Sequence, residues 1–133
     1  MRVITLCFTM LLSCAVTANQ YVFETWVENM TQCALKFDAE PNIHWDGKSE
    51  LPISFQQVQA IFSSWAESNL VAGEAAHVTS YELASVAADG LAMNHWVFKI
   101  KYVVFENNVP SASFNRKVAL NLSGQIIEAD CGI

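Results

Sequence analysis

Apolar side chains between Asn19 and Phe37 recur at intervals of three and four residues, which is the spacing of one face of an α-helix. A helix is therefore predicted over about residues 20–36. Cys33 falls on the same face, so its sulfur is expected to point toward the core. The apolar positions are Phe23, Trp26, Val27, Met30, Ala34 and Phe37.

A second predicted helix has a clear start signal. Ser54 is a favourable N-cap, and Gln57 follows three residues later, as a capping box requires. Ile53 and Val58 stand where a hydrophobic staple would join them across the cap. An apolar stripe follows, and the helix is predicted over about residues 55–70.

From about residue 77 onward the hydrophobic period becomes two, which indicates β-strands. The clearest strand is 96–105, where one set of alternate positions is apolar and aromatic and the other contains lysines. Short turns separate four such strands, so an antiparallel meander is predicted. The turns are Asp89–Gly90, Asn107–Pro110 and Ser123–Gly124.

The order of these elements predicts an α+β domain over residues 19–133, in which two N-terminal helices pack on a four-stranded antiparallel meander. The layout is similar in outline to cystatin-like and NTF2-like folds, in which a curved meander wraps helices. The similarity is one of topology, and no family motif accompanies it. Fold analogy alone therefore gives no function.

The first 18 residues resemble a secretory signal peptide. Arg2 supplies a positive charge, residues 3–16 are uncharged and largely apolar, and a cut after Ala18 would follow small or modest side chains. The apolar run is shorter than the roughly 20 residues that a spanning helix needs. An alternative cut precedes Cys14, because Leu11–Cys14 resembles a bacterial lipobox. The chain is expected to be periplasmic or secreted, or else a lipoprotein anchored through Cys14.

Removal of this segment changes both the charge and the cysteine count. The whole chain has 13 acidic and 7 basic side chains, a net charge of −6. Loss of Arg2 leaves 6 basic side chains and a net charge of −7, which argues against nucleic acid as a partner. Cys33 and Cys131 are the cysteines that remain, and in an oxidising compartment they are expected to form one disulfide. A disulfide that closes a loop of roughly 100 residues stabilises the folded state by about 4.7 kcal/mol, because it lowers the entropy of the unfolded chain.

Little in the sequence predicts catalysis or metal binding. Nucleophile motifs, phosphate loops and dinucleotide fingerprints are missing, and His44, His77 and His95 are not spaced as zinc ligands. His95 lies on the lysine side of its strand and is expected to be exposed. The loop around His44 could form an oxygen-rich cation site, although a solvated acidic loop is the favoured interpretation; its acids are Asp38, Glu40 and Asp46. We assign no catalytic residue, metal or cofactor.

Two sets of side chains are candidates for binding. The first would contact a protein partner, and consists of a loop pair and a local basic stripe on the outer face of the sheet: His44, Trp45, Lys99, Lys101 and Lys117. Trp45 could equally anchor its loop in the core. The second set would line a pocket between sheet and helices: Tyr81, Tyr102 and Arg116. Arg116 shares the register of apolar residues, so it needs a partner unless its head reaches solvent.

These features favour a small exported, disulfide-stabilised, non-enzymatic protein-binding module, such as an inhibitor, an immunity-type protein or an accessory protein. The identity of the partner is left open, and membrane association is expected only if Cys14 is lipidated. One alternative is an NTF2-like carrier or enzyme with an apolar pocket between sheet and helices. A lipid-anchored envelope component is the other.

Overall fold

The computed structural model describes residues 20–111 and 116–132, and these residues form one helix and two antiparallel sheets. The predicted signal peptide, with both of its proposed cleavage sites, lies outside the described residues, as does Phe114. Within the described ranges, no helix is both long enough and apolar enough to cross a membrane.

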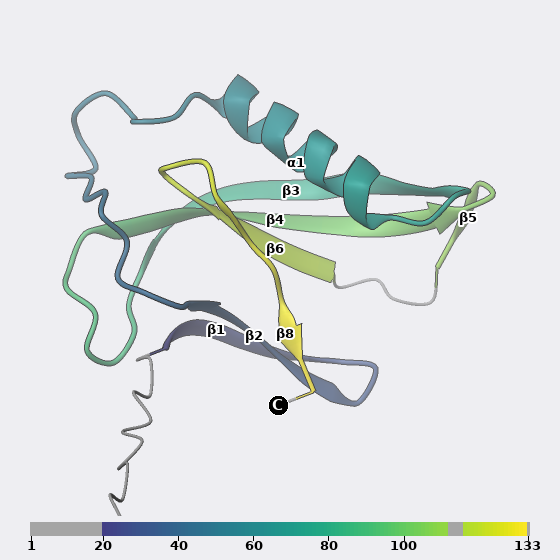
Figure 1. Cartoon of the computed structure of the whole chain (residues 1–133), viewed down its shortest axis with the longest axis horizontal. Coiled ribbons are helices and arrows are strands. Elements are labelled where there is room, and N and C mark those ends of the chain that lie inside the picture. Colours follow the sequence, from purple (N-terminus) through teal and green to yellow (C-terminus); the bar gives the residue numbers. More distant parts are fainter. Residues whose placement is uncertain (1–19, 112–115, 133) are drawn as a thin grey trace, which may run out of the picture.

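The molecule is built in three layers (Figure 1). The helix α1 (Phe55–Asn69) covers one face of the larger sheet, and the smaller sheet lies against the opposite face. The larger sheet has the order β3-β4-β6-β7, with β5 paired to β4; its strands are β3 (Glu74–Val86), β4 (His95–Glu106), β5 (Val109–Pro110), β6 (Arg116–Asn121) and β7 (Ile126–Ile127). The smaller sheet has the order β1-β2-β8, formed by β1 (Tyr21–Glu28), β2 (Thr31–Phe37) and β8 (Asp130–Cys131).

The predicted fold class is wrong, because the segment 20–36 is the β1–β2 hairpin and no helix. A bulge explains the misleading period. The pairing register shifts between Val22 and Glu24, so Phe23 is an extra residue in β1. The bulge changes the phase of the alternation, and the inward Phe23 and Trp26 are therefore three residues apart, as on a helix.

The turn of this hairpin contradicts the predicted helix in a second way. Asn29 and Met30 both have positive φ, 49° and 61°, which is the conformation that a two-residue hairpin turn requires. Met30 was expected on the buried face of a helix, but its position at the tip leaves it 99% exposed.

The helix predicted at 55–70 is confirmed as α1. The capping box is complete: the backbone N–H of Gln57 donates to the Ser54 hydroxyl at 3.1 Å, and the backbone N–H of Ser54 donates to Oε1 of Gln57 at 2.8 Å. Ile53 and Val58 are both buried in the cluster beneath the helix. This boundary was predictable because it is encoded by adjacent residues.

The antiparallel sheet is confirmed, but its last predicted strand is divided. β7 stays in the larger sheet beside β6, whereas β8 leaves it and pairs with β2. The switch places Cys131 directly opposite Cys33, and the predicted disulfide between these residues is present. The disulfide therefore lies within the smaller sheet, between strands from the two ends of the domain.

Apolar clusters fill both sides of the larger sheet. Between α1 and the sheet, Val58 meets the completely buried Ile100 and Leu120. On the opposite face, Leu35 of β2 belongs to a cluster with Val97 of β4. Both faces of the larger sheet are therefore covered, which the sequence pattern did not predict.

Candidate functional site

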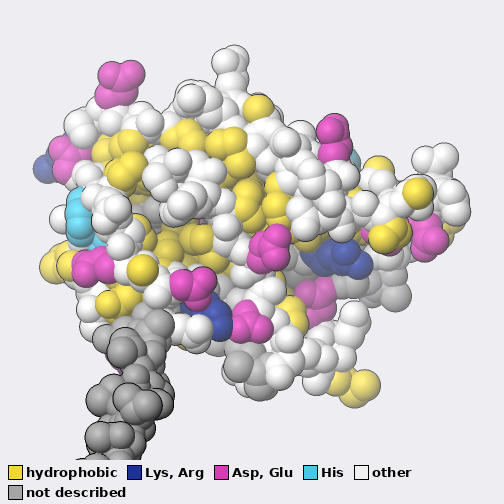
Figure 2. All heavy atoms as spheres, viewed as in Figure 1, with side chains coloured by type: hydrophobic (Ala, Val, Ile, Leu, Met, Phe, Trp, Pro, Cys, Tyr) yellow, Lys and Arg dark blue, Asp and Glu magenta, His cyan; other side chains and the backbone are white. Residues whose placement is uncertain are grey.

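A cleft of about 1030 Å³ opens between the segment that follows β2 and the turn that joins β6 to β7. It combines apolar and acidic side chains. Figure 2 shows hydrophobic side chains within a hollow on this face and acidic side chains around it. Its buried and half-buried apolar residues are Phe37, Ile126 and Ile127, and its exposed acidic residues are Asp38, Glu40 and Glu128. We call this feature the acidic cleft.

Among the described residues, the one basic side chain that lines the acidic cleft is Lys36, and its charge is already compensated. Its ammonium group forms an ion pair with Asp130 and donates to Oε1 of Gln20 at 3.1 Å. Glu128 accepts a hydrogen bond from the indole N–H of Trp65 at 2.8 Å, which fixes the carboxylate at the edge of the cleft. The charge that the cleft offers to a partner is therefore negative.

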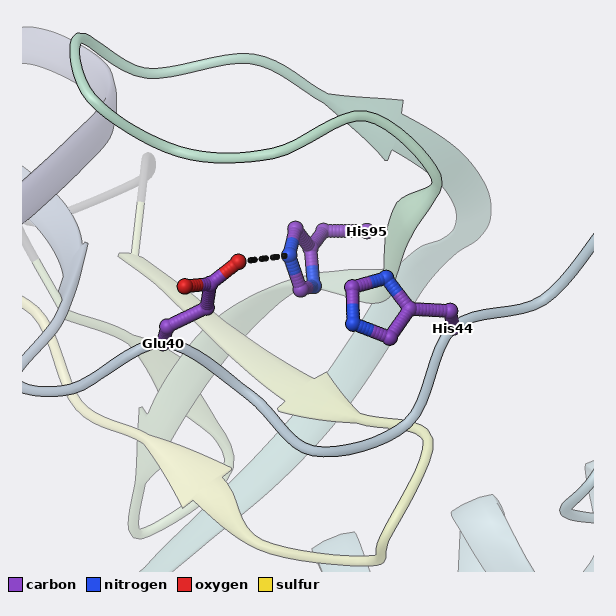
Figure 3. Close-up of side chains that lie close together, drawn as sticks. All are labelled: Glu40, His44 and His95. Atoms are coloured by element: carbon purple, nitrogen blue, oxygen red, sulfur yellow. Dashed lines mark hydrogen bonds and ion pairs between the residues drawn. The ribbon is translucent and has the colours of Figure 1, made fainter.

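A cluster of two histidines and one carboxylate adjoins the cleft (Figure 3). Atoms of Glu40, His44 and His95 that could bind a metal ion all lie within 4.8 Å of one another. Nε2 of His95 is 3.3 Å from Oε1 of Glu40, and the two imidazole centroids are 4.4 Å apart. Because Glu40 also lines the acidic cleft, the two features are continuous.

The partners of the two imidazoles indicate which nitrogens carry a proton. Nδ1 of His44 is 3.4 Å from the carbonyl oxygen of Met93, and a carbonyl can only accept, so this contact favours a proton on Nδ1. The carboxylate of Glu40 in the same way favours a proton on Nε2 of His95. The lone pairs then lie on Nε2 of His44 and Nδ1 of His95.

Nδ1 of His95 is the most unusual atom of the cluster. His95 is only 1% exposed, and this nitrogen is buried without a hydrogen-bond partner. In Figure 3 it lies on the side of the ring that faces His44. A buried polar atom without a partner is uncommon in a native structure, so it calls for a physical explanation.

Two tryptophans bring the histidines together. Trp45 follows His44 and Trp96 follows His95, and the two indoles pack edge to face with centroids 5.0 Å apart. The backbone N–H of Trp45 donates to the carbonyl of Asn94 at 3.3 Å, and its indole N–H donates to the carbonyl of Ser49 at 3.1 Å. Trp45 is therefore the anchor of its loop, and it holds the loop against the start of β4.

Asp46 shapes the same loop and is not a member of the cluster. Its Oδ1 accepts hydrogen bonds at 2.8 Å from the backbone N–H of Ser49, the backbone N–H of Lys48 and the Ser49 hydroxyl. The bonds from Ser49 and Lys48 hold the pKa of this exposed carboxyl below its usual value. Among the described residues this loop does not form the oxygen-rich cluster considered for it, and Glu40 lies beside two imidazoles instead.

The expected basic stripe lies mostly inside the molecule. Lys99 and Lys117 face the smaller sheet, where both form ion pairs with Glu24 at 2.7 and 2.8 Å. Lys101 is exposed. This sheet face was expected to be open to solvent, but the β1–β2 hairpin covers it. His95 starts the same strand and is buried for the same reason, so the expectation that it is exposed is wrong.

Two of the three predicted pocket residues share a pocket. Tyr102 and Arg116 are register partners on β4 and β6, and they line a pocket of about 370 Å³ beside the disulfide. Burial raises the pKa of Tyr102, although the guanidinium of Arg116 opposes this shift. Tyr81 lies elsewhere, with its ring edge-on to Phe55 at 5.0 Å.

The histidine cluster was missed because sequence spacing does not reveal contacts between distant segments. One signal was nevertheless present, since the dipeptide His-Trp occurs twice, at 44–45 and 95–96. In the structure the two dipeptides lie against each other, histidine beside histidine and tryptophan beside tryptophan.

Comparison with known proteins adds no relative: no protein-family model, curated protein or solved structure matches the chain. The residues of the site therefore carry the functional argument by themselves.

Proposed function

We propose that the chain is an exported, non-enzymatic binding module whose acidic cleft receives a basic segment of a partner protein. The observation that carries this proposal is the charge of the cleft: in the described part of the chain, three exposed carboxylates line it, and Lys36 is paired with Asp130. Complementary charge speeds association and sets specificity. Apolar side chains between the carboxylates supply surface that a partner can bury.

The predicted basic stripe does not supply the charge that a partner would meet, because two of its three lysines are paired inside the molecule. Lys99 and Lys117 are occupied by Glu24, so Lys101 is the lysine of the stripe that stays exposed, whereas the acidic cleft presents three exposed carboxylates. A partner segment rich in Lys or Arg is therefore the better match. Whether the module acts as an inhibitor, an immunity-type protein or an accessory protein depends on the identity of that partner.

Export is part of the same proposal, and two features support it. The first 18 residues have the pattern of a signal peptide, and a disulfide of this kind persists in oxidising compartments. Mass spectrometry of the mature protein tests it. A first residue of Asn19 supports cleavage after Ala18, a lipidated Cys14 supports a membrane anchor, and an intact Met1 contradicts export.

Binding of an acetylated, amidated lysine-rich peptide, followed by fluorescence anisotropy, tests the cleft. The double substitution D38N/E128Q removes two carboxylates from the cleft and leaves Glu40 in place. The control E67Q/E106Q removes the same charge from exposed residues outside the cleft. We expect the first variant to weaken binding about tenfold and the control to change it less than twofold. Equal weakening in both would mean that net charge alone attracts the peptide, and no binding to the parent chain would reject the cleft.

A further inference from the structure

We infer that His44, His95 and Glu40 form a binding site for a divalent transition-metal ion, for which Zn²⁺ is the test ion. The ion would be held by Nε2 of His44 and Nδ1 of His95. Glu40 would orient His95 through its Nε2–H. The metal site shares Glu40 with the acidic cleft but does not need the function proposed for it, because it rests on the positions of the two imidazoles and on their hydrogen-bond partners.

The unpartnered nitrogen is the first argument. Burial of a polar group without a hydrogen bond is unfavourable, and Nδ1 of His95 is such a group. A metal ion bound to its lone pair would remove this cost. The contact with Glu40 favours a proton on the opposite nitrogen, so the lone pair on Nδ1 is available.

The surroundings of both imidazoles supply the second argument. A histidine that binds a metal ion usually donates its other N–H to a carboxylate or a backbone carbonyl. His95 has the Glu40 carboxylate in this position, and His44 has the carbonyl of Met93. Each ring is thus oriented by the kind of group that orients metal-binding histidines, and the two rings are neighbours.

The ligand atoms indicate the class of ion. Imidazole nitrogen suits Zn²⁺, Cu²⁺ and Ni²⁺, whereas Mg²⁺ and Ca²⁺ prefer oxygen. His95 is fixed in the core, while His44 and Glu40 are exposed on the loop. Exposure leaves the remaining coordination positions accessible to water or to a ligand from outside.

Calorimetric titration of the metal-stripped, disulfide-bonded chain with Zn²⁺ tests the site. We expect one equivalent to bind. H44Q should abolish this binding or weaken it at least 100-fold, and E40Q should weaken it about 10-fold, as loss of an outer-shell partner does. The matched control is H77Q, because His77 is an exposed histidine on β3 outside the cluster; it should bind Zn²⁺ as the parent chain does.

Two further measurements keep the test decisive if a variant folds poorly. In ¹⁵N spectra of the imidazoles, Zn²⁺ should shift the ring nitrogens of His44 and His95 and leave those of His77 unchanged. A 100-fold excess of Mg²⁺ should not displace Zn²⁺. Unchanged Zn²⁺ affinity in H44Q, displacement by Mg²⁺, or no binding to the parent chain would each overturn the proposal, the last result indicating that water satisfies Nδ1 of His95.

Discussion

At the scale of single residues, Glu24 is a half-buried carboxylate that forms ion pairs with two lysines at once. It projects from β1 toward the larger sheet and contacts Lys99 and Lys117, and Lys117 also lies over the Trp26 ring at 4.7 Å. Burial by itself raises the pKa of Glu24, but the hydrogen bonds and charges of the two lysines outweigh it, so the pKa is lowered from 4.5. The carboxylate therefore links the two sheets in its charged form.

A lowered pKa in the folded state makes this link dependent on pH. Its contribution to stability is complete above the ordinary carboxyl pKa and is lost as the pH falls through the lower pKa of the folded state. E24Q leaves two lysines without their partner, so it should reduce the free energy of unfolding by about 2 kcal/mol near neutral pH. The difference should shrink as the solution is acidified. Urea unfolding across the acid range measures it, with E67Q on α1 as the control; a constant difference at all pH values would contradict the ion-pair role.

At the scale of elements, the chain shows which local signals decide structure. The α1 boundary follows from neighbouring residues that satisfy one another, Ser54 and Gln57. The β1–β2 hairpin follows from the bulge at Phe23 and the turn at Asn29–Met30, which the hydrophobic period does not report. Methionine is not the residue that the second turn position favours, since positive φ suits glycine.

A substitution in this turn should therefore increase the stability of the protein. M30G should stabilise the protein by about 0.5–1 kcal/mol, because removal of Cβ relieves the steric cost of positive φ. Met30 is 99% exposed, so little packing is lost. Chemical denaturation measures the change. M93G serves as the control, since Met93 is also exposed but is not at positive φ; an equal gain in both variants would rule out the turn as the cause.

Whether a feature could be predicted from the sequence depended on how far apart along the chain its residues lie. The capping box and the alternation of β4 are contained in short segments, and both were predictable. The ion pairs of Glu24 and the contact of His44 with His95 join separate segments, so no period reports them. The disulfide was an exception, because removal of the predicted signal peptide would leave Cys33 and Cys131 as the remaining pair.

At the scale of the whole molecule, the disulfide joins the first hairpin to the end of the chain. Cys33 lies in β2 and is 1% exposed, and Cys131 lies 98 positions later in β8. β8 has only two residues, Asp130 and Cys131, and both pair with β2. So short a strand contributes few backbone hydrogen bonds. The covalent bond therefore keeps β8 beside β2.

Removal of this bond should have a large effect. C33S/C131S is expected to lower the melting temperature by about 10–20 °C, from the loop-closure entropy of roughly 4.7 kcal/mol for a loop of this length. Scanning calorimetry of the parent chain, with and without reductant, provides the comparison. Reduced parent and double variant should melt together, and an unchanged melting temperature in the variant would show that the bond does not limit stability.

Glu40 belongs to two features at once, since it lines the acidic cleft and contacts His95. A group shared by two binding equilibria makes them thermodynamically linked. A cation of the partner that attracts the Glu40 carboxylate into the cleft would weaken its hydrogen bond with Nε2–H of His95. A metal ion bound to the same imidazole would make that N–H a stronger donor and would strengthen the hydrogen bond. Linkage is reciprocal, so each ligand would lower the affinity for the other by the same factor. Under the two proposals, a rise in the supply of metal would therefore weaken the binding of a basic segment in the acidic cleft.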